Sequence, residues 1–172
     1  MPKVTRDEFW AILAERPTLD ELVATLSRLT AREIAAFDGH LADCRLAAHR
    51  ADLWGAAYLI NNGCSDDGFD YFRCWLVAQG RAVYEAALAD PDSLAGHGPV
   101  RSSIAGDLGA CEYEDFMYAP EWAHRQLTGR GLPEGGGAYP RLGRFWDFND
   151  DDEMRRRYPR LMALLDESDA IA

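Results

Sequence analysis

The sequence lacks the long apolar runs that mark export signals and membrane spans. The opening residues, MPKVTRDEFW, contain no apolar core of the kind found in a signal peptide. No apolar run elsewhere approaches the roughly 20 residues that a membrane-spanning helix needs. We therefore expect a cytoplasmic protein that has no membrane partner.

Basic residues are scarce relative to acidic ones. The chain of 172 residues contains 29 Asp and Glu against 18 Lys and Arg, which gives a formal net charge of −11. Such a field repels phosphate backbones, so we expect no nucleic-acid partner. A basic protein surface, a basic peptide or a small cation is favoured electrostatically, although acidity also serves simply to keep a small protein soluble.

Motifs for catalysis and for cofactor or metal binding are missing as well. There is no P-loop, dinucleotide fingerprint, H-E-x-x-H motif or G-x-S-x-G motif. Cys44, Cys64, Cys74 and Cys111 form no C-x-x-C pair, so we expect reduced and mostly buried thiols. His40 and Cys44 have a usable metal-ligand spacing, but two ligands do not make a site. We predict no metal and no cofactor.

The sequence is instead rich in signals for the start and end of helices. Three capping boxes, TRDE at Thr5, TLDE at Thr18 and TARE at Thr30, predict three helix starts in the N-terminal third. The third helix can run towards His49 with apolar residues along one face. No segment shows sustained alternation of apolar and polar residues, and no internal repeat is found.

Two central helices follow from the segment between residues 52 and 80. DLWGAAYLINNG predicts an apolar helix with Asp52 as its cap and residues 61–63 as its stop. SDDGFDYFRCWLVAQG predicts the next helix, with Ser65 as its cap and Gly80 at its end. A further helix is expected from residue 81 to 89.

The C-terminal third has weaker signals. GHGPVRSSIAGDLG (residues 96–109) and TGRGLPEGGGAYPRLGR predict long loops, with short helices between them at residues 110–117 and 121–127. NDDDE at residues 149–153 predicts a helix start, and Pro159 predicts a kink or a new helix. The sequence therefore predicts an all-α protein, a single compact domain of about seven to nine helices with long irregular loops in its last third.

The block from Asp52 to Ala95, together with the T-R-D-E-F-W opening, resembles a known family. The run W-G-A-A-Y-L-I-N-N-G-C-S-D-D-G-F-D-Y-F-R-C-W-L is similar to the hallmark of domain of unknown function 4240, a bacterial family common in actinobacteria. The resemblance implies a compact helical protein and assigns no catalytic residues. It indicates a family domain over residues 1–128, with a Gly-rich loop and C-terminal helical extension over residues 129–172 packed on it.

One corner between the two central helices gathers more polar groups than a helix cap needs. Asp66, Asp67, Asp70 and Arg73 fall within about two helical turns, and such groups could hold a polar ligand or polarise water. Acids in a first turn also stabilise a helix by themselves, and Asp70 with Arg73 is an ordinary same-face pair. The ligand-binding candidates are Asn61, Asn62, Ser65, Asp66, Asp67, Asp70, Arg73, Trp54 and Tyr58.

Other chemically active residues have simpler explanations. Cys64 lies just before a helix start, which lowers a thiol pKa, but the nearby acids oppose that effect and favour a structural thiol. His49, His97 and His124 are isolated in the sequence, and His97 fits a surface loop. NDDDE lacks the alternating ligand spacing of a calcium loop.

The sequence leaves two hypotheses for the function. The first is a protein-interaction or regulatory module, of inhibitor or immunity type, that binds a basic protein or peptide. The alternative is a small enzyme or ligand-binding protein that uses the corner from Asn61 to Arg73, with the loops at residues 96–109 and 128–143 as lids. An open and concave corner favours the alternative, whereas side chains that are all consumed by caps exclude it.

Overall fold

The protein is all-α, as predicted. The computed structural model describes residues 4–107, 109–133 and 138–170. These ranges contain ten α-helices and two short 3-10 helices, with no strand among them. More helices form than the about seven to nine predicted, because short helices occupy segments that the sequence analysis assigned to loops.

Three helices begin where the capping boxes predicted. The threonines at positions 5, 18 and 30 each accept a hydrogen bond from the backbone N–H of the glutamate three residues later, and that glutamate bonds back to the threonine N–H. Two backbone donors that have no partner within the helix are satisfied at each start. The helices are α1 (Arg6–Leu13), α2 (Leu19–Leu26) and α3 (Ala31–Ala47).

The two central helices are α4 (Ala51–Ile60) and α5 (Asp66–Ala78). The prediction that Asp52 caps α4 was wrong. Arg50 occupies the cap position without a capping side chain, and Asp52 lies in the first turn, where it forms an ion pair with Arg50. An acid in this position still stabilises the positive end of the helix dipole.

The turn between α4 and α5 uses left-handed backbone at two adjacent residues. Asn62 has φ +53° and Gly63 has φ +112°. The Gly63 N–H donates to the Tyr58 carbonyl at 2.8 Å, which satisfies a carbonyl in the last turn of α4. Asn and Gly tolerate this backbone best, so the predicted stop at Asn61–Gly63 is confirmed. Ser65 caps α5, also as predicted.

The observed helices differ from the predicted ones mainly between residues 90 and 118. After α6 (Arg81–Ala89), a 3-10 helix η1 (Pro91–Gly96) and α7 (Gly98–Ile104) replace most of the predicted loop at residues 96–109. Proline in the first turn of both elements suits a helix start. The predicted helix at residues 110–117 is instead the 3-10 helix η2 (Glu114–Tyr118).

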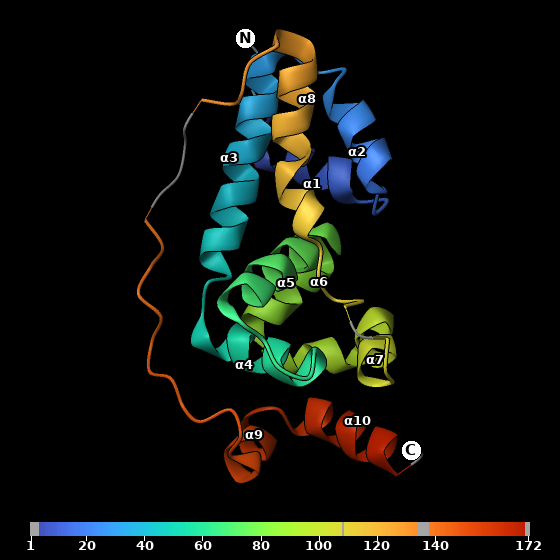
Figure 1. Ribbon diagram of the computed structural model, residues 1–172, viewed down its shortest axis with the longest axis vertical. Helices are drawn as coiled ribbons and strands as arrows, with labels where there is room; N and C mark the ends of the chain where they lie inside the picture. Colours follow the sequence, from blue (N-terminus) through green and yellow to red (C-terminus); the bar gives the residue numbers. More distant parts are fainter. Residues whose placement is uncertain (1–3, 108, 134–137, 171–172) are drawn as a thin grey trace.

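Of the last three α-helices, the first lies at one end of the molecule and the other two lie at the opposite end. Figure 1 shows α8 (Ala119–Thr128) beside α2 and α3 at one end, with α9 (Asp151–Arg157) and α10 (Pro159–Asp169) at the other. Residues 138–148 descend along the outside of the helices towards α9 without regular secondary structure. We call this segment the strap.

A buried carboxylate joins α10 to the rest of the protein. Asp92 in η1 is 3% exposed and accepts from the backbone N–H groups of Arg160 at 3.0 Å and Leu161 at 2.9 Å. These donors lie in the first turn of α10, so a side chain from far away in the sequence supplies the cap that the local sequence lacks. Leu161 and Met162 then complete one continuous apolar core.

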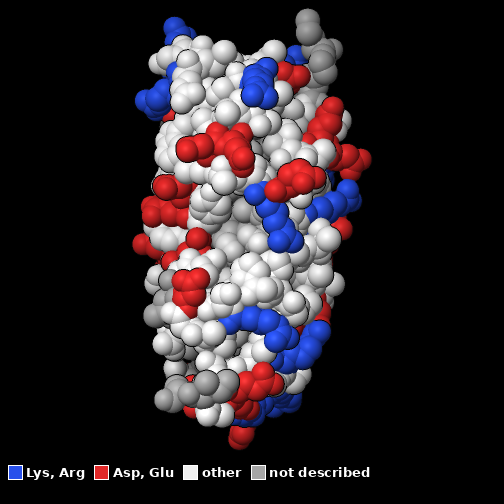
Figure 2. Space-filling model, turned by 90° about the vertical axis from the view of Figure 1, so that its right-hand side faces the viewer, with Lys and Arg blue, Asp and Glu red and all other residues white. Residues whose placement is uncertain are grey.

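The surface carries both charges. Figure 2 shows acidic and basic side chains interspersed on one face, with uncharged areas between them. In the part of the chain that the structure describes, no helix has the length and apolarity needed to cross a membrane.

Candidate functional site

The polar corner predicted from the sequence divides into two parts. Asn61, Asn62 and Ser65 form the turn itself. The Ser65 hydroxyl accepts from the Gly68 N–H at 3.1 Å, and the Asn61 side-chain oxygen accepts from the Ser103 hydroxyl at 3.4 Å. None of these three residues is among those that line the cavity beside the turn.

The remaining part of the corner is open and concave. A cavity of about 430 Å³ lies between the first turns of α5, the end of α3 and the strap. We call it the acidic cleft. It is lined by His49, Trp54, Asp66, Asp67, Phe69, Asp70, Arg73, Tyr139, Leu142 and Phe145.

The floor of the acidic cleft is a pair of stacked rings. Trp54 of α4 and Phe69 of α5 have centroids 4.7 Å apart and planes inclined by 16°. The Trp54 ring is fixed in place because its Nε1 donates to the Cys64 carbonyl at 3.0 Å. Phe69 is 1% exposed and anchors the stack in the core.

The strap supplies the opposite wall. Tyr139, Leu142 and Phe145 recur every three residues and all line the acidic cleft. Phe145 meets Trp54 edge to face at 5.5 Å between centroids, and Tyr139 lies 4.8 Å from the His49 ring. Since Tyr139 and Phe145 are 50% and 43% exposed, they form a rim that solvent reaches from outside.

A buried guanidinium forms the deepest polar part. Arg73 is 1% exposed, donates from Nη1 to the Arg45 carbonyl at 2.8 Å and forms an ion pair with Asp70. Its guanidinium carbon lies 5.0 Å from the Phe69 ring centroid and 5.1 Å from that of Tyr139. Burial lowers the pKa of Arg73, while the ion pair and the two rings compensate its charge. Its Nε has no hydrogen-bond partner among the residues that the structure describes.

The negative charges of two carboxylates at the rim are not neutralised by an ion pair among the described residues. Asp66 and Asp67 occupy the first turn of α5 and are exposed. Among the described residues neither has an ion-pair partner, whereas Asp70 is paired with Arg73 and lies 3.8 Å from Arg45 Nη2. Three carboxylates against one guanidinium give the lining a formal charge of −2 with neutral histidine.

His49 stays neutral at the back of the acidic cleft. Burial lowers its pKa, and the positive charge of Arg73 lowers it further. A neutral imidazole adds no positive charge against a cationic ligand. The Nδ1 atom of His49 is buried and has no hydrogen-bond partner within the described part of the chain, so it presents an uncommitted polar atom just after α3.

Tyr58 lies outside the acidic cleft and holds the strap. Its hydroxyl donates to the Asn149 side-chain oxygen at 2.8 Å, and its ring lies 5.4 Å from that of Phe148. Further along, Trp146 packs over Gly55, where an added Cβ would come within 3.0 Å of the indole. Tyr58 and Gly55 therefore position the wall.

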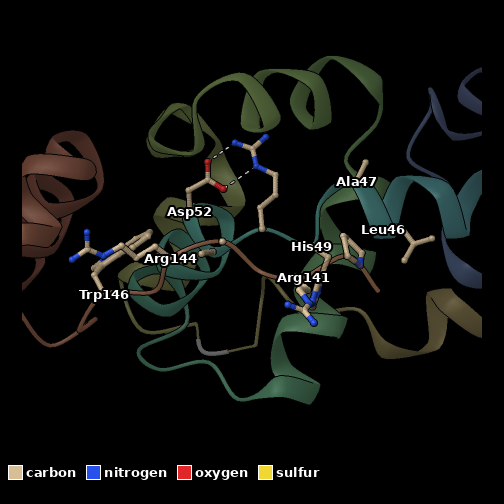
Figure 3. Close-up of a pocket in the computed structure, with 11 residues that line it drawn as sticks. Leu46, Ala47, His49, Asp52, Arg141, Arg144 and Trp146 are labelled. Atoms are coloured by element: carbon tan, nitrogen blue, oxygen red, sulfur yellow. Dashed lines mark hydrogen bonds and ion pairs between the residues drawn. The ribbon is translucent and has the colours of Figure 1, made fainter. Parts of the chain in front are cut away.

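A second groove lies on the other side of the strap. It has a volume of about 520 Å³ and is drawn in Figure 3. His49 and Arg141 lie at one end and Arg144 and Trp146 at the other, with the ion pair of Asp52 and Arg50 between them. The strap arginines diverge, so they do not converge on one anion. This groove shows how the strap separates basic from acidic surface.

The other reactive residues serve the fold. Burial raises the pKa of the Cys64 thiol to about 12, with Glu112 and Asp66 adding to the effect, so Cys64 is not an activated nucleophile. His40 donates from Nε2 to the Val4 carbonyl, and His97 contacts the Gln79 side chain at 2.9 Å. In the described ranges no three His, Cys, Asp or Glu side chains are arranged to hold a metal ion.

Half of the acidic cleft was not predicted from the sequence. His49 was taken as isolated, and the wall residues Tyr139, Leu142 and Phe145 were placed in a loop. The one signal available was the three-residue spacing of these apolar side chains between prolines, glycines and arginines. That spacing is typical of a polyproline II chain, which has three residues per turn and so presents every third side chain on one side.

A family model matches residues 4–126, more than two thirds of the chain. It is that of DUF4240, which is described as a protein of unknown function. The matched range includes the floor and the carboxylates of the acidic cleft but not its wall. Comparison with curated proteins and with solved structures finds no match.

Proposed function

Because the chain belongs to the DUF4240 family of proteins of unknown function, we propose its function from its own geometry. It is a ligand-binding protein, and the acidic cleft binds a small organic cation with an apolar body. The observation that carries the proposal is the combination of stacked and rim aromatic rings with two uncompensated carboxylates, Asp66 and Asp67, in one open cavity.

Each half of this ligand matches one half of the cavity. Aromatic ring faces attract an ammonium or guanidinium group and exclude water from its apolar body. Carboxylates at the rim add Coulomb attraction and draw cations towards a protein that already carries −11. Arg73 does not oppose the ligand, because Asp70 neutralises its charge.

Benzyltrimethylammonium is a suitable probe, measured by isothermal titration calorimetry against neutral benzyl alcohol. We expect the cation to bind and the alcohol to bind at least tenfold more weakly. Replacing both rim carboxylates, Asp66→Asn with Asp67→Asn, should weaken cation binding about tenfold, because two exposed charge contacts contribute about 0.5–1 kcal/mol each.

Asp151→Asn with Asp152→Asn is the matched control. These acids occupy the same two first-turn positions of α9 as Asp66 and Asp67 do of α5, and they are equally exposed. Both double variants lose similar helix-dipole stabilisation, so only a ligand contact separates them. Equal cation affinity in both variants would refute the assignment of the acidic cleft.

A protein-interaction role is the second candidate, as the sequence analysis favoured. It is supported by two exposed aromatic residues, Tyr118 at the end of η2 and Trp122 on α8, whose ring centroids lie 6.1 Å apart. The described residues give the inhibitor and immunity-type roles no separate support. The four cysteines are unpaired, which favours the reducing cytoplasm as the location for either role.

A further inference from the structure

Aromatic side chains outside the acidic cleft lie on α5, at the end of η2 and on α8. Asp67 at the rim and Tyr71 are one turn apart on α5, and therefore share a face. The Tyr113 N–H donates to the Tyr71 carbonyl at 3.1 Å, which holds the start of η2 against α5. Tyr118 at the end of η2 then stacks on Trp122, with centroids 6.1 Å apart and planes inclined by 27°. We call Tyr71, Tyr118 and Trp122 the aromatic track.

Acidic groups flank the aromatic track at Tyr71. Burial raises the pKa of the Tyr71 hydroxyl, and the carboxylates of Glu114 and Asp67 raise it further, as does Tyr118. These groups therefore lie close enough to act on one another. Glu114 is exposed, and among the described residues it forms no ion pair. The track thus repeats the combination found in the cleft, aromatic faces beside uncompensated carboxylates.

Two rings of the aromatic track, those of Tyr118 and Trp122, are exposed to solvent. Tyr118 is 42% and Trp122 37% exposed, although both are large enough to bury well over a hundred square ångströms. Tyr and Trp are the residues that contribute most to binding at protein interfaces. Asp67 lines the acidic cleft and also acts on Tyr71, so one elongated ligand could contact both surfaces.

We propose that the acidic cleft and the aromatic track together bind an extended, arginine- or lysine-rich peptide segment of a partner protein. This inference rests on the proposed cation-binding function of the cleft, which accepts one basic side chain. The next basic side chains of the segment stack on the track and pair with its flanking acids. An extended chain advances about 3.3 Å per residue, so basic residues at every second position lie on one side of it.

The test uses a fluorescein-labelled octapeptide of alternating glycine and arginine, with fluorescence anisotropy as the readout. The reference peptide has glutamine in place of arginine. We expect the full-length protein to bind the arginine peptide at least tenfold more tightly than the glutamine peptide. Equal binding of the two peptides would overturn the proposal, because charge would then not be what the surface recognises.

Variants separate the track from the cleft. Tyr118→Ser with Trp122→Ser should weaken arginine-peptide binding about tenfold, because two cation–π contacts are lost. Binding of benzyltrimethylammonium should not change. Leu127→Ser is the matched control, since Leu127 is 48% exposed on the same helix but lies outside the track, and it should leave both ligands unaffected.

The outcomes distinguish the two proposals. If the double variant binds the peptide as the unaltered protein does, the track is not the peptide site, while the cation site in the cleft stands on its own titration. If neither benzyltrimethylammonium nor the peptide binds the unaltered protein, both proposals fail together. Circular dichroism of each variant checks that the helices are retained.

Discussion

The helical body and the strap position aromatic side chains in opposite ways. In the body, rings such as Phe37 and Phe72 are completely buried, and the helices that carry them are fixed by their own capping residues. In the strap, Tyr139 and Phe145 are about half exposed and are held by a few ring and cation–π contacts and by the Tyr58–Asn149 hydrogen bond. The body is held together by its core, whereas the strap depends on a few contacts.

This difference shows how the acidic cleft is built. Its floor, Trp54 and Phe69, belongs to two packed helices and keeps a fixed geometry. Its wall, Tyr139 and Phe145, belongs to a segment with few buried contacts, which is the kind of segment that opens locally at little cost. The cleft therefore combines a rigid surface with an adjustable one.

The same substitution in both regions gives the largest expected contrast. Phe37→Ala should lower the free energy of unfolding by about 3–5 kcal/mol, because it leaves a cavity in the core. Phe145→Ala should lower it by less than about 1 kcal/mol, because the ring is 43% exposed. Urea unfolding of both variants measures the difference. Equal losses would show that the strap is part of the core after all.

A glycine at the boundary between the two regions gives the next largest effect. At Gly55 an added Cβ would lie 2.4 Å from the buried Tyr158 hydroxyl and 3.0 Å from Trp146, so Gly55→Ala should cost about 1–3 kcal/mol. Gly39→Ala in α3 is the control, because nothing lies within 4 Å of its added Cβ. Gly39→Ala should raise the free energy of unfolding by about 0.5–1 kcal/mol. Thermal unfolding of the two variants should therefore shift in opposite directions.

The smallest expected effect is on the pH dependence of the free energy of unfolding, and it arises in the helical body alone. Hydrogen bonds from the capping threonines lower the pKa of Glu8, Glu21 and Glu33 in the folded state. A lowered folded pKa adds stability above the unfolded value of about 4.3, and this stability is lost as the pH falls through the folded pKa.

Replacing one of these glutamates isolates its share of the pH dependence. Glu33→Gln keeps an acceptor at the capping position but does not titrate. We expect the free energy of unfolding of this variant to fall less between pH 7 and pH 3 than that of the unaltered protein, measured by urea unfolding at each pH. An unchanged slope would mean that the capping box of Thr30 does not contribute.

Local signals made the helical body predictable. The capping boxes and the Asn61–Gly63 stop are read from residues within one turn of each other, and the structure confirms both. The failures arose where partners are distant. The cap of α10 comes from Asp92, which lies 69 residues before Leu161, and no local pattern indicates that pairing.

The candidate site was predictable only on its helical side. Asp66, Asp67 and Arg73 were identified because their spacing places them on one helix start. Their neighbour Tyr139 lies on a strap whose anchor joins residues 91 positions apart, Tyr58 and Asn149. Such contacts depend on the complete fold, so the sequence showed the acids and left the wall that faces them unplaced.

Because the strap is tethered to the helical body, a free molecule that replaces it must compete with a high local concentration of the strap. A segment joined to its surface through a short connection is present there at an effective concentration on the order of millimolar. The strap is connected to the body on one side through α8 and on the other through α9 and α10. A competitor with similar contacts must therefore approach millimolar concentration to displace Tyr139 and Phe145. At lower concentrations such a competitor does not displace the wall, which remains the adjustable side of the cleft and contributes to ligand affinity.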